Sequence, residues 1–282
     1  MLNALTIDIE DYFQVNAFAR HVCQDEWGSF PLRVEGNSRR ILELLDSFSI
    51  KATFFILGWV AERCPELVRE IHHCGHEIAC HGYGHELVYR IGHERFRDDI
   101  RRAKMILEDI TGELIIGYRA PSYSITRQSL WALDILVEEG FRYDSSIFPV
   151  HHDIYGIPAA PRFPHDIRTE AGSIREFPIS TFLLNVGAWH ANVPIAGGGY
   201  LRLLPAPLIG YAINYINTRE MQPAVIYFHP WEIDPGQPRV KAGLKSRFRH
   251  YLNLERMEAK IKYLLSSLRF TAVRDIHGFG PS

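Results

Sequence analysis

Short runs of β-branched and aromatic residues alternate with amphipathic segments along most of this chain. Such alternation is typical of repeated strand–helix units around a parallel sheet and not of a β-sandwich. The expected strands are Leu5–Ile9, Ala52–Leu57, Glu77–Cys80, Ile115–Tyr118, Arg142–Asp144, Arg175–Pro178, Ala224–Phe228 and Thr271–Val273. The sequence therefore predicts an α/β fold in which strands and helices form a barrel.

Amphipathic helices are expected between these strands. In the first helix, apolar residues recur at i, i+3, i+4 and i+7 from Ile41, and Asn37 is the expected N-cap. The same reasoning predicts the helices Ser38–Ser47, Val60–His73, His93–Thr111, Gln128–Glu139 and Leu252–Leu268. Gly75, Gly112 and Gly140 each follow one of these helices, where a left-handed residue commonly ends a helix.

Length and apolar content predict a single domain over residues 1–282. Of the 282 residues, 46% are hydrophobic, and one α/β barrel routinely uses about 250 residues. The strand–helix rhythm weakens at residues 149–207, which are rich in proline and include Gly197-Gly198-Gly199. We expect a loop-rich insertion there, lying over the mouth of the barrel.

Charge and hydropathy argue against several classes of protein. The 31 Lys and Arg residues balance 33 Asp and Glu residues without long runs of one sign, so nucleic acid is not an expected partner. Asp8 interrupts the first apolar run and no later window is long and apolar enough for a membrane span, so we expect a cytoplasmic protein. The four cysteines lack CxxC spacing, which predicts reduced, mostly buried thiols.

In barrels of this kind, catalytic groups lie at the carboxyl ends of strands. The first expected strand ends in Asp8, Glu10 and Asp11. Alternation along a strand places Asp8 and Glu10 on one side, with Asp11 already in the loop. Crowded carboxylates raise one another's pKa unless a cation compensates them. The cluster is therefore either a cation site or a solvated acidic loop.

The third expected strand is followed by His81 and His85. Two histidines at this spacing on one turn can converge on a single metal ion. A set of two histidines and one carboxylate leaves coordination positions open for water and substrate. With the carboxylates that end the first strand, these residues predict a hydrolytic metal site.

Three more polar residues end expected strands. Arg119 can pair with and orient a carboxylate, although an Arg before Ala-Pro can also be a surface residue. His229 is a candidate general acid, with a structural histidine as the alternative. Asp144 could hold the imidazole of His229 in one tautomer, or could cap a turn.

These residues, in chain order, resemble the five motifs of the NodB-homology polysaccharide deacetylases, the carbohydrate esterase family 4 type. The motifs are Asp8-Ile9-Glu10, His81-xxx-His85, Arg119-Ala120-Pro121, Asp144 and the strand ending in His229. The resemblance spans nearly the whole chain. Two further segments are similar to the subgroup found at bacterial exopolysaccharide and exosortase loci, namely Glu10-Asp11-Tyr12-Phe13-Gln14 and residues 197–205.

The resemblance implies a distorted (β/α)7 TIM-like barrel that binds one divalent metal ion, Zn²⁺ or else Co²⁺, Ni²⁺ or Fe²⁺. It also implies that His81 and His85 are ligands, Asp8 the general base, and His229 the general acid. By the same resemblance, Arg119 orients Asp8 and Asp144 tunes His229. The first motif departs from the family pattern of two adjacent aspartates and a glycine. The third ligand is therefore either Glu10 or Asp11.

The implied activity is the hydrolysis of N-acetyl groups on N-acetylhexosamine units of a polysaccharide. Asp8 would take a proton from water, a backbone N–H near Ser122-Tyr123 would bind the oxyanion, and His229 would protonate the leaving nitrogen. One alternative is hydrolysis of a small cyclic amide or ureide. Another is a sugar-binding barrel without catalysis, with stacking platforms at Tyr12, Phe13, Trp27, Trp189 and Trp231.

Overall fold

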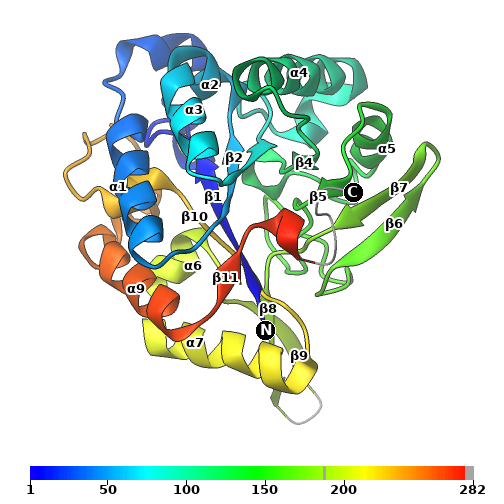
Figure 1. Cartoon of the computed structure of the whole chain (residues 1–282), viewed down its shortest axis with the longest axis vertical. Helices are drawn as coiled ribbons and strands as arrows, with labels where there is room; N and C mark the ends of the chain where they lie inside the picture. The colour runs from blue at the N-terminus through cyan, green and yellow to red at the C-terminus, as the bar shows by residue number, and fades with distance from the viewer. Residues whose placement is uncertain (187–188, 277–282) are drawn as a thin grey trace.

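The computed structural model describes residues 1–186 and 189–276 of this chain. It contains a mixed, mostly parallel sheet surrounded by helices (Figure 1). The strand order is β10-β1-β2-β3-β4-β5-β7-β6, and β11 pairs with β1. The strands of this sheet are β1 (Asn3–Ile9), β2 (Thr53–Ile56), β3 (Glu77–Cys80), β4 (Gly117–Tyr118), β5 (Tyr143–Asp144), β6 (His165–Thr169), β7 (Gly172–Glu176), β10 (Val225–Phe228) and β11 (Phe270–Thr271). This confirms the predicted α/β class.

Helices cover the outer face of the sheet, as Figure 1 shows for α1 to α5 and for α9. The α-helices are α1 (Val34–Ser47), α2 (Gly58–Arg63), α3 (Pro65–His73), α4 (Val88–Thr111), α5 (Trp131–Glu138), α6 (Gly198–Leu203), α7 (Ala206–Tyr215), α8 (Leu244–Tyr251) and α9 (Leu254–Ser267). Every residue of β1, β2, β3 and β10 is buried. Full burial of parallel strands explains why they read as continuous apolar runs.

Irregular chain completes the ring between β7 and β10. The N–H of Ser180 donates to the carbonyl of Val225 at 3.1 Å, and Gly197 forms a parallel bridge with Tyr227. The sheet therefore curls back towards its first edge, as in a distorted barrel. At the other end of the strand order, β6 is antiparallel to β7.

The predicted strands all overlap observed strands, but several helix boundaries were wrong. The predicted helix Val60–His73 is two helices, because Pro65 cannot continue the backbone hydrogen bonding of α2 and instead begins α3. Asn37 lies inside α1, so it is not the N-cap. Gly75, Gly112 and Gly140 all have positive φ, which confirms the predicted helix ends. All four cysteines are free, but only Cys64 and Cys80 are buried.

Residues 149–207 contain more regular structure than a set of loops. Besides β6 and β7 they form a hairpin of β8 (Thr181–Val186) and β9 (Trp189–Pro194), followed by α6. The base of this hairpin lies beside Val225, the first residue of β10, and Figure 1 shows β8 and β9 near the start of β1. The hairpin is therefore at the amino-terminal end of the strands. Within residues 149–207, it is segments outside this hairpin that reach the carboxyl-terminal end of the strands.

Gly197 provides a test of how tightly this closing segment packs. Gly197 has φ 140°, a backbone conformation essentially restricted to glycine, and an added Cβ would overlap the ring of Tyr227. Gly197→Ala should therefore lower the free energy of unfolding by about 2 kcal/mol or more. The matched control is Gly36→Ala inside α1, where nothing lies within 4 Å of an added Cβ. That change should raise stability by about 0.5–1 kcal/mol. Urea titration of both variants measures the difference, and equal stability would contradict the packing argument.

Candidate metal and catalytic site

A cavity of about 880 Å³ lies at the carboxyl ends of the parallel strands. Its lining includes Asp8, Glu10, His81, His85 and His229, which lie at the ends of β1, β3 and β10 or in the loops that follow. The structure thus brings together residues from three separate sequence motifs. Exposed residues complete the lining, so the cavity opens to solvent.

Glu10, His81 and His85 form one cluster, and their potential ligand atoms all lie within 4.8 Å of one another. The loop after β3 turns sharply to bring His85 back, with φ 52° at that residue. The carboxylate of Asp99 holds this loop by accepting the N–H groups of Tyr83, at 2.8 Å, and of Gly84, at 3.0 Å. Sequence reasoning missed Asp99, which lies within α4.

The donor atoms of this cluster fit a divalent cation. Nδ1 of His81 lies 2.8 Å from the carbonyl oxygen of Arg119, and a carbonyl can only accept, so Nδ1 carries the proton and Nε2 presents a lone pair. Burial lowers the pKa of His81 to about 4, which keeps the ring neutral. Oε2 of Glu10 is buried and accepts no hydrogen bond, although it lies 2.8 Å from Nε2 of His85. Two imidazoles and one carboxylate are ligands that Zn²⁺ accepts.

Glu10 stays ionised despite its burial. Burial alone would raise its pKa, but the imidazoles of His85 and His229 hold the pKa of this carboxyl well below its ordinary value. Oε1 of Glu10 is 3.0 Å from Nε2 of His229. Glu10 therefore links His85 of the second motif to His229 of the fifth.

The alternative ligand Asp11 has a different task. Oδ2 accepts the N–H groups of Arg33, at 2.7 Å, and Val34, at 3.0 Å, at the start of α1, while Oδ1 accepts that of Tyr12 at 2.9 Å. The carboxylate thus caps this helix, the role expected of Asn37, and it lies outside the cluster of potential ligands. The structure favours Glu10 over Asp11 as the third ligand. Burial raises the pKa of Asp11 to about 6.

Asp8 and Arg119 form a buried ion pair beside this cluster. Nη1 of Arg119 is 2.6 Å from Oδ1 of Asp8 and also donates to Oγ1 of Thr6 at 2.7 Å. Nε and Nη2 donate to the carbonyl and the hydroxyl of Ser145. Because the guanidinium is fully buried and bonded on three sides, the position of Asp8 is tightly fixed.

His229 lies between two carboxylates. Besides Glu10, its partner is Glu232, whose Oε2 is 3.2 Å from Nδ1 and accepts the backbone N–H of His229 at 3.0 Å. Burial alone would lower the pKa of His229, but these two carboxylates raise it to about 10. The expected partner, Asp144, makes no such contact, so that assignment was wrong.

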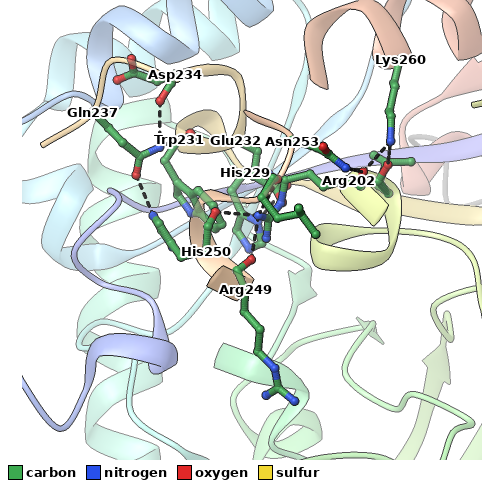
Figure 2. Close-up of polar contacts among 12 residues, drawn as sticks. Arg202, His229, Trp231, Glu232, Asp234, Gln237, Arg249, His250, Asn253 and Lys260 are labelled. Carbon is green, nitrogen blue, oxygen red and sulfur yellow. Dashed lines mark hydrogen bonds and ion pairs between the residues drawn. The ribbon is translucent and has the colours of Figure 1, made fainter. Parts of the chain in front are cut away.

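A second buried arginine holds Glu232 in place. Nε of Arg202 donates to Oε1 of Glu232 at 2.7 Å, and Nη1 donates to the carbonyls of Arg249, His250 and Leu252 (Figure 2). Burial would raise the pKa of Glu232, but Arg202 and His229 keep it below its ordinary value. Sequence reasoning missed both Glu232 and Arg202. The spacing of His229 and Glu232, three residues apart, was the available signal because it matches a capping box.

Asp144 instead supports the loop that carries Arg119. Its Oδ1 accepts the hydroxyl of Ser146, and Oγ of Ser146 accepts the N–H of Ala120 at 2.7 Å. Burial raises the pKa of Asp144 to about 6, and it also raises the pKa of the neighbouring Glu176. The turn-capping alternative is therefore the better description of this residue.

The aromatic residues considered as sugar platforms are mostly core residues. Tyr12, Phe13, Trp27 and Trp231 are each at most 5% exposed. Phe13 packs on Trp27, and the ring of Trp231 stacks between His229 and His250. The side chain of Trp189 lies outside the described residues. These four aromatics cannot stack on a sugar without unfolding, which argues against the non-catalytic alternative that relied on them.

Two family models match the chain. Residues 26–140 match the family described as polysaccharide deacetylase. Residues 145–277 match a family described as a domain of unknown function. The first region includes His81, His85 and Arg119, and the second includes His229.

Curated relatives match part of the chain. It is 32% identical over 130 residues to a peptidoglycan deacetylase-like protein of Gibberella zeae, which covers 45% of this chain and 37% of that protein. It is 30% identical over 114 residues to a peptidoglycan deacetylase of Helicobacter pylori, with 40% of this chain and 37% of that protein covered. The match thus spans little more than a third of each relative.

Solved structures show a similar fold across nearly the whole chain. A Mycobacterium smegmatis protein described as a polysaccharide deacetylase has 23% identity and a TM-score of 0.62, with 98% of this chain and 88% of that chain covered. An allantoinase has 18% identity and a TM-score of 0.58 with the same coverage. At such identity the likeness shows the fold alone. Residues 26–140 are thus similar to polysaccharide deacetylases, and the curated relatives show the same similarity over little more than a third of their own length.

Proposed function

We propose that this protein is a metal-dependent N-deacetylase that removes acetyl groups from N-acetylhexosamine units of a polysaccharide. The observation that carries the proposal is the convergence of Glu10, His81 and His85 beside Asp8 and His229 in one open cavity. These five residues include an ion-binding cluster and two groups that can transfer protons. That combination is what hydrolysis of an unreactive amide requires.

Glu10, His81 and His85 would hold one divalent ion, with Zn²⁺ the best match to the ligand set and Co²⁺, Ni²⁺ or Fe²⁺ as alternatives. Such an ion, when bound, supplies Lewis-acid polarisation of the substrate carbonyl and a water of lowered pKa. Asp8 would accept a proton from the attacking water as general base. Arg119 keeps Asp8 oriented and balances its charge inside the protein.

His229 would protonate the departing nitrogen as general acid. Glu232 fixes its ring from the Nδ1 side, so Nε2 is the atom that faces the cavity centre. One backbone N–H near Ser122-Tyr123 was expected at the oxyanion, and that of Tyr123 already donates to the carbonyl of Ala120 at 3.0 Å. The remaining candidate is Ser122, which lines the cavity and has φ 53°. A strained backbone at such a position is common in functional sites.

The open cavity favours a polymer over a small cyclic amide. At about 880 Å³ and with an exposed rim, it can admit more than one sugar unit. The two curated relatives described above are named as peptidoglycan deacetylase and peptidoglycan deacetylase-like, which supports a glycan substrate. The similarity of residues 197–205 to the exopolysaccharide-locus subgroup makes an exopolysaccharide our first choice of glycan.

Acetate release from N-acetylglucosamine oligomers tests the function directly. Chelated protein should release no acetate, and protein reloaded with Zn²⁺ should regain turnover. Asp8→Asn should bind the ion yet lose turnover by several orders of magnitude, because the base is removed and the ligands are kept. Elemental analysis supplies the metal content. Allantoin hydrolysis without acetate release would replace this proposal with the small-amide alternative.

A pair of neighbouring variants tests which carboxylate holds the ion. Glu10→Gln should lower metal content sharply, since the amide is a far weaker ligand. Asp11→Asn should keep the metal and instead lower the free energy of unfolding by about 1 kcal/mol, because the helix cap is weakened. Elemental analysis and urea titration on the same samples separate the two effects. The reverse pattern would transfer the ligand role to Asp11.

The acid role of His229 is tested by the leaving group. Loss of a general acid typically costs about 10²- to 10⁴-fold in rate. His229→Ala should therefore slow acetamide cleavage by that order while an activated aryl acetate, whose leaving group needs little protonation, is affected far less. Glu232→Gln, which removes only the ring's partner, should show the same selectivity in weaker form. Equal losses on both substrates would mean that His229 is a packing residue or a ligand.

A further inference from the structure

Four cationic side chains line the solvent-exposed part of the catalytic cavity. They are Arg20, Arg90, Lys245 and Arg249, and all four are exposed. The lining also contains the acidic residues of the site, Asp8 and Glu10, which are already paired with Arg119 and with histidines. Among the described residues that line the cavity, Asp153 supplies the only other carboxylate. The mouth is therefore positively charged in a protein whose formal net charge is -2.

These four cations lack ion-pair partners. In the described residues, no carboxylate oxygen lies within 4.0 Å of their charged nitrogens. Asp153 contacts His152 at 3.1 Å and is the one carboxylate of the lining that the charges of Arg249 and Lys245 reach, so it offsets only part of the positive charge. Other exposed arginines are paired, such as Arg95 with Glu86 at 2.8 Å. Unpaired cations that line a cavity attract anions in proportion to the charge left uncompensated.

The segment that supplies Lys245 and Arg249 is fixed next to the site. Residues 235–254, which include α8, contain five Lys and Arg residues and no Asp or Glu. Nη1 of Arg202 donates to the carbonyl of Arg249 at 2.8 Å, while Nε bonds to Glu232 (Figure 2). One buried arginine thus connects the cationic helix to the partner of His229. The side chain of Arg249 points away from this network in Figure 2.

We infer that the mouth of the cavity binds the negative charges of a polyanionic glycan, whose chain carries carboxylate or phosphate groups near its acetamido sugars. This inference rests on the proposed function and names its substrate class. The cations are exposed and come from three separate segments, so they do not form the converging, buried donors of a single phosphate site. Distributed, exposed charge suits a flexible polymer with repeated charges. Tyr89 and Tyr200 also line the cavity and are partly exposed, so their rings can contact sugars.

The test compares two N-acetylglucosamine oligomers of equal length, one neutral and one with part of its primary hydroxyls oxidised to carboxylates. Binding is measured by calorimetry and turnover by acetate release, both on metal-loaded protein. At low ionic strength, affinity and kcat/KM should favour the carboxylated oligomer by on the order of tenfold. The ratios of affinity and of kcat/KM between the charged and neutral oligomers should fall towards one at about 0.5 M salt, because charges are then screened beyond a few ångströms. An oligomer phosphorylated at the same hydroxyls shows which anion is preferred.

The double variant Lys245→Gln with Arg249→Gln should lower the preference for the charged oligomer by several-fold, because two cations of the mouth are lost. Arg247→Gln is the matched control. It removes one cation from the same helix, but Arg247 does not line the cavity, so the preference should be unchanged.

Equal affinity of wild-type protein for the neutral and charged oligomers would overturn the inference, even with full deacetylase activity. Failure to release acetate from either oligomer would count against the proposed function, whereas calorimetry would still decide the charge preference. Exposed Leu244 and Phe248 on α8 suggest one competing partner, an anionic lipid surface. Binding to phosphatidylglycerol vesicles without any preference between oligomers would replace the glycan with a membrane.

Discussion

The buried guanidinium of Arg119 is the interaction on which the catalytic end of the barrel depends. It bonds to Thr6 and Asp8 of β1 and to Ser145 after β5, and it lies 4.1 Å from the ring centre of Phe55 in β2. One side chain thus ties three strands together where they end. A buried charge is costly without compensation, so Arg119 and Asp8 stabilise each other only as a pair. This pairing fixes the position of Asp8, the proposed base, and the same contact stabilises the fold.

A second buried pair, Arg202 with Glu232, serves His229 in a similar way. Asp8 and Arg119 lie in the amino-terminal part of the chain. Arg202 and Glu232 lie within residues 145–277, which match a family described as a domain of unknown function. That region also supplies Lys245 and Arg249 at the cavity mouth. The amino-terminal part thus contributes the cluster of potential metal ligands and the proposed base, while the carboxy-terminal part contributes the proposed acid and much of the cavity mouth. Within the described residues, no helix is long and apolar enough to span a lipid bilayer.

Prediction from the sequence was most accurate where a local pattern has a single physical cause. Buried parallel strands produce apolar runs, so all eight predicted strands overlap observed ones. It was least accurate where a partner is distant in sequence. Asn37 has the right chemistry for an N-cap, but the cap of α1 is Asp11, from the loop after β1. The hairpin of β8 and β9 was missed because the prolines and glycines of residues 149–207 suggested loops.

The sequence by itself determined the α/β class, the strand ends that bear functional groups and the set of residues that meet in the cavity. These features follow from periodicity and from residue chemistry, which are local properties of a chain. Only the tertiary structure decided which groups pair. It assigned Glu232 rather than Asp144 to His229, placed Glu10 rather than Asp11 with His81 and His85, and left the cations of the mouth unpaired. Most of these choices depend on distances between segments far apart in the chain, which spacing along a sequence does not give, and Glu232, three residues after His229, is the exception.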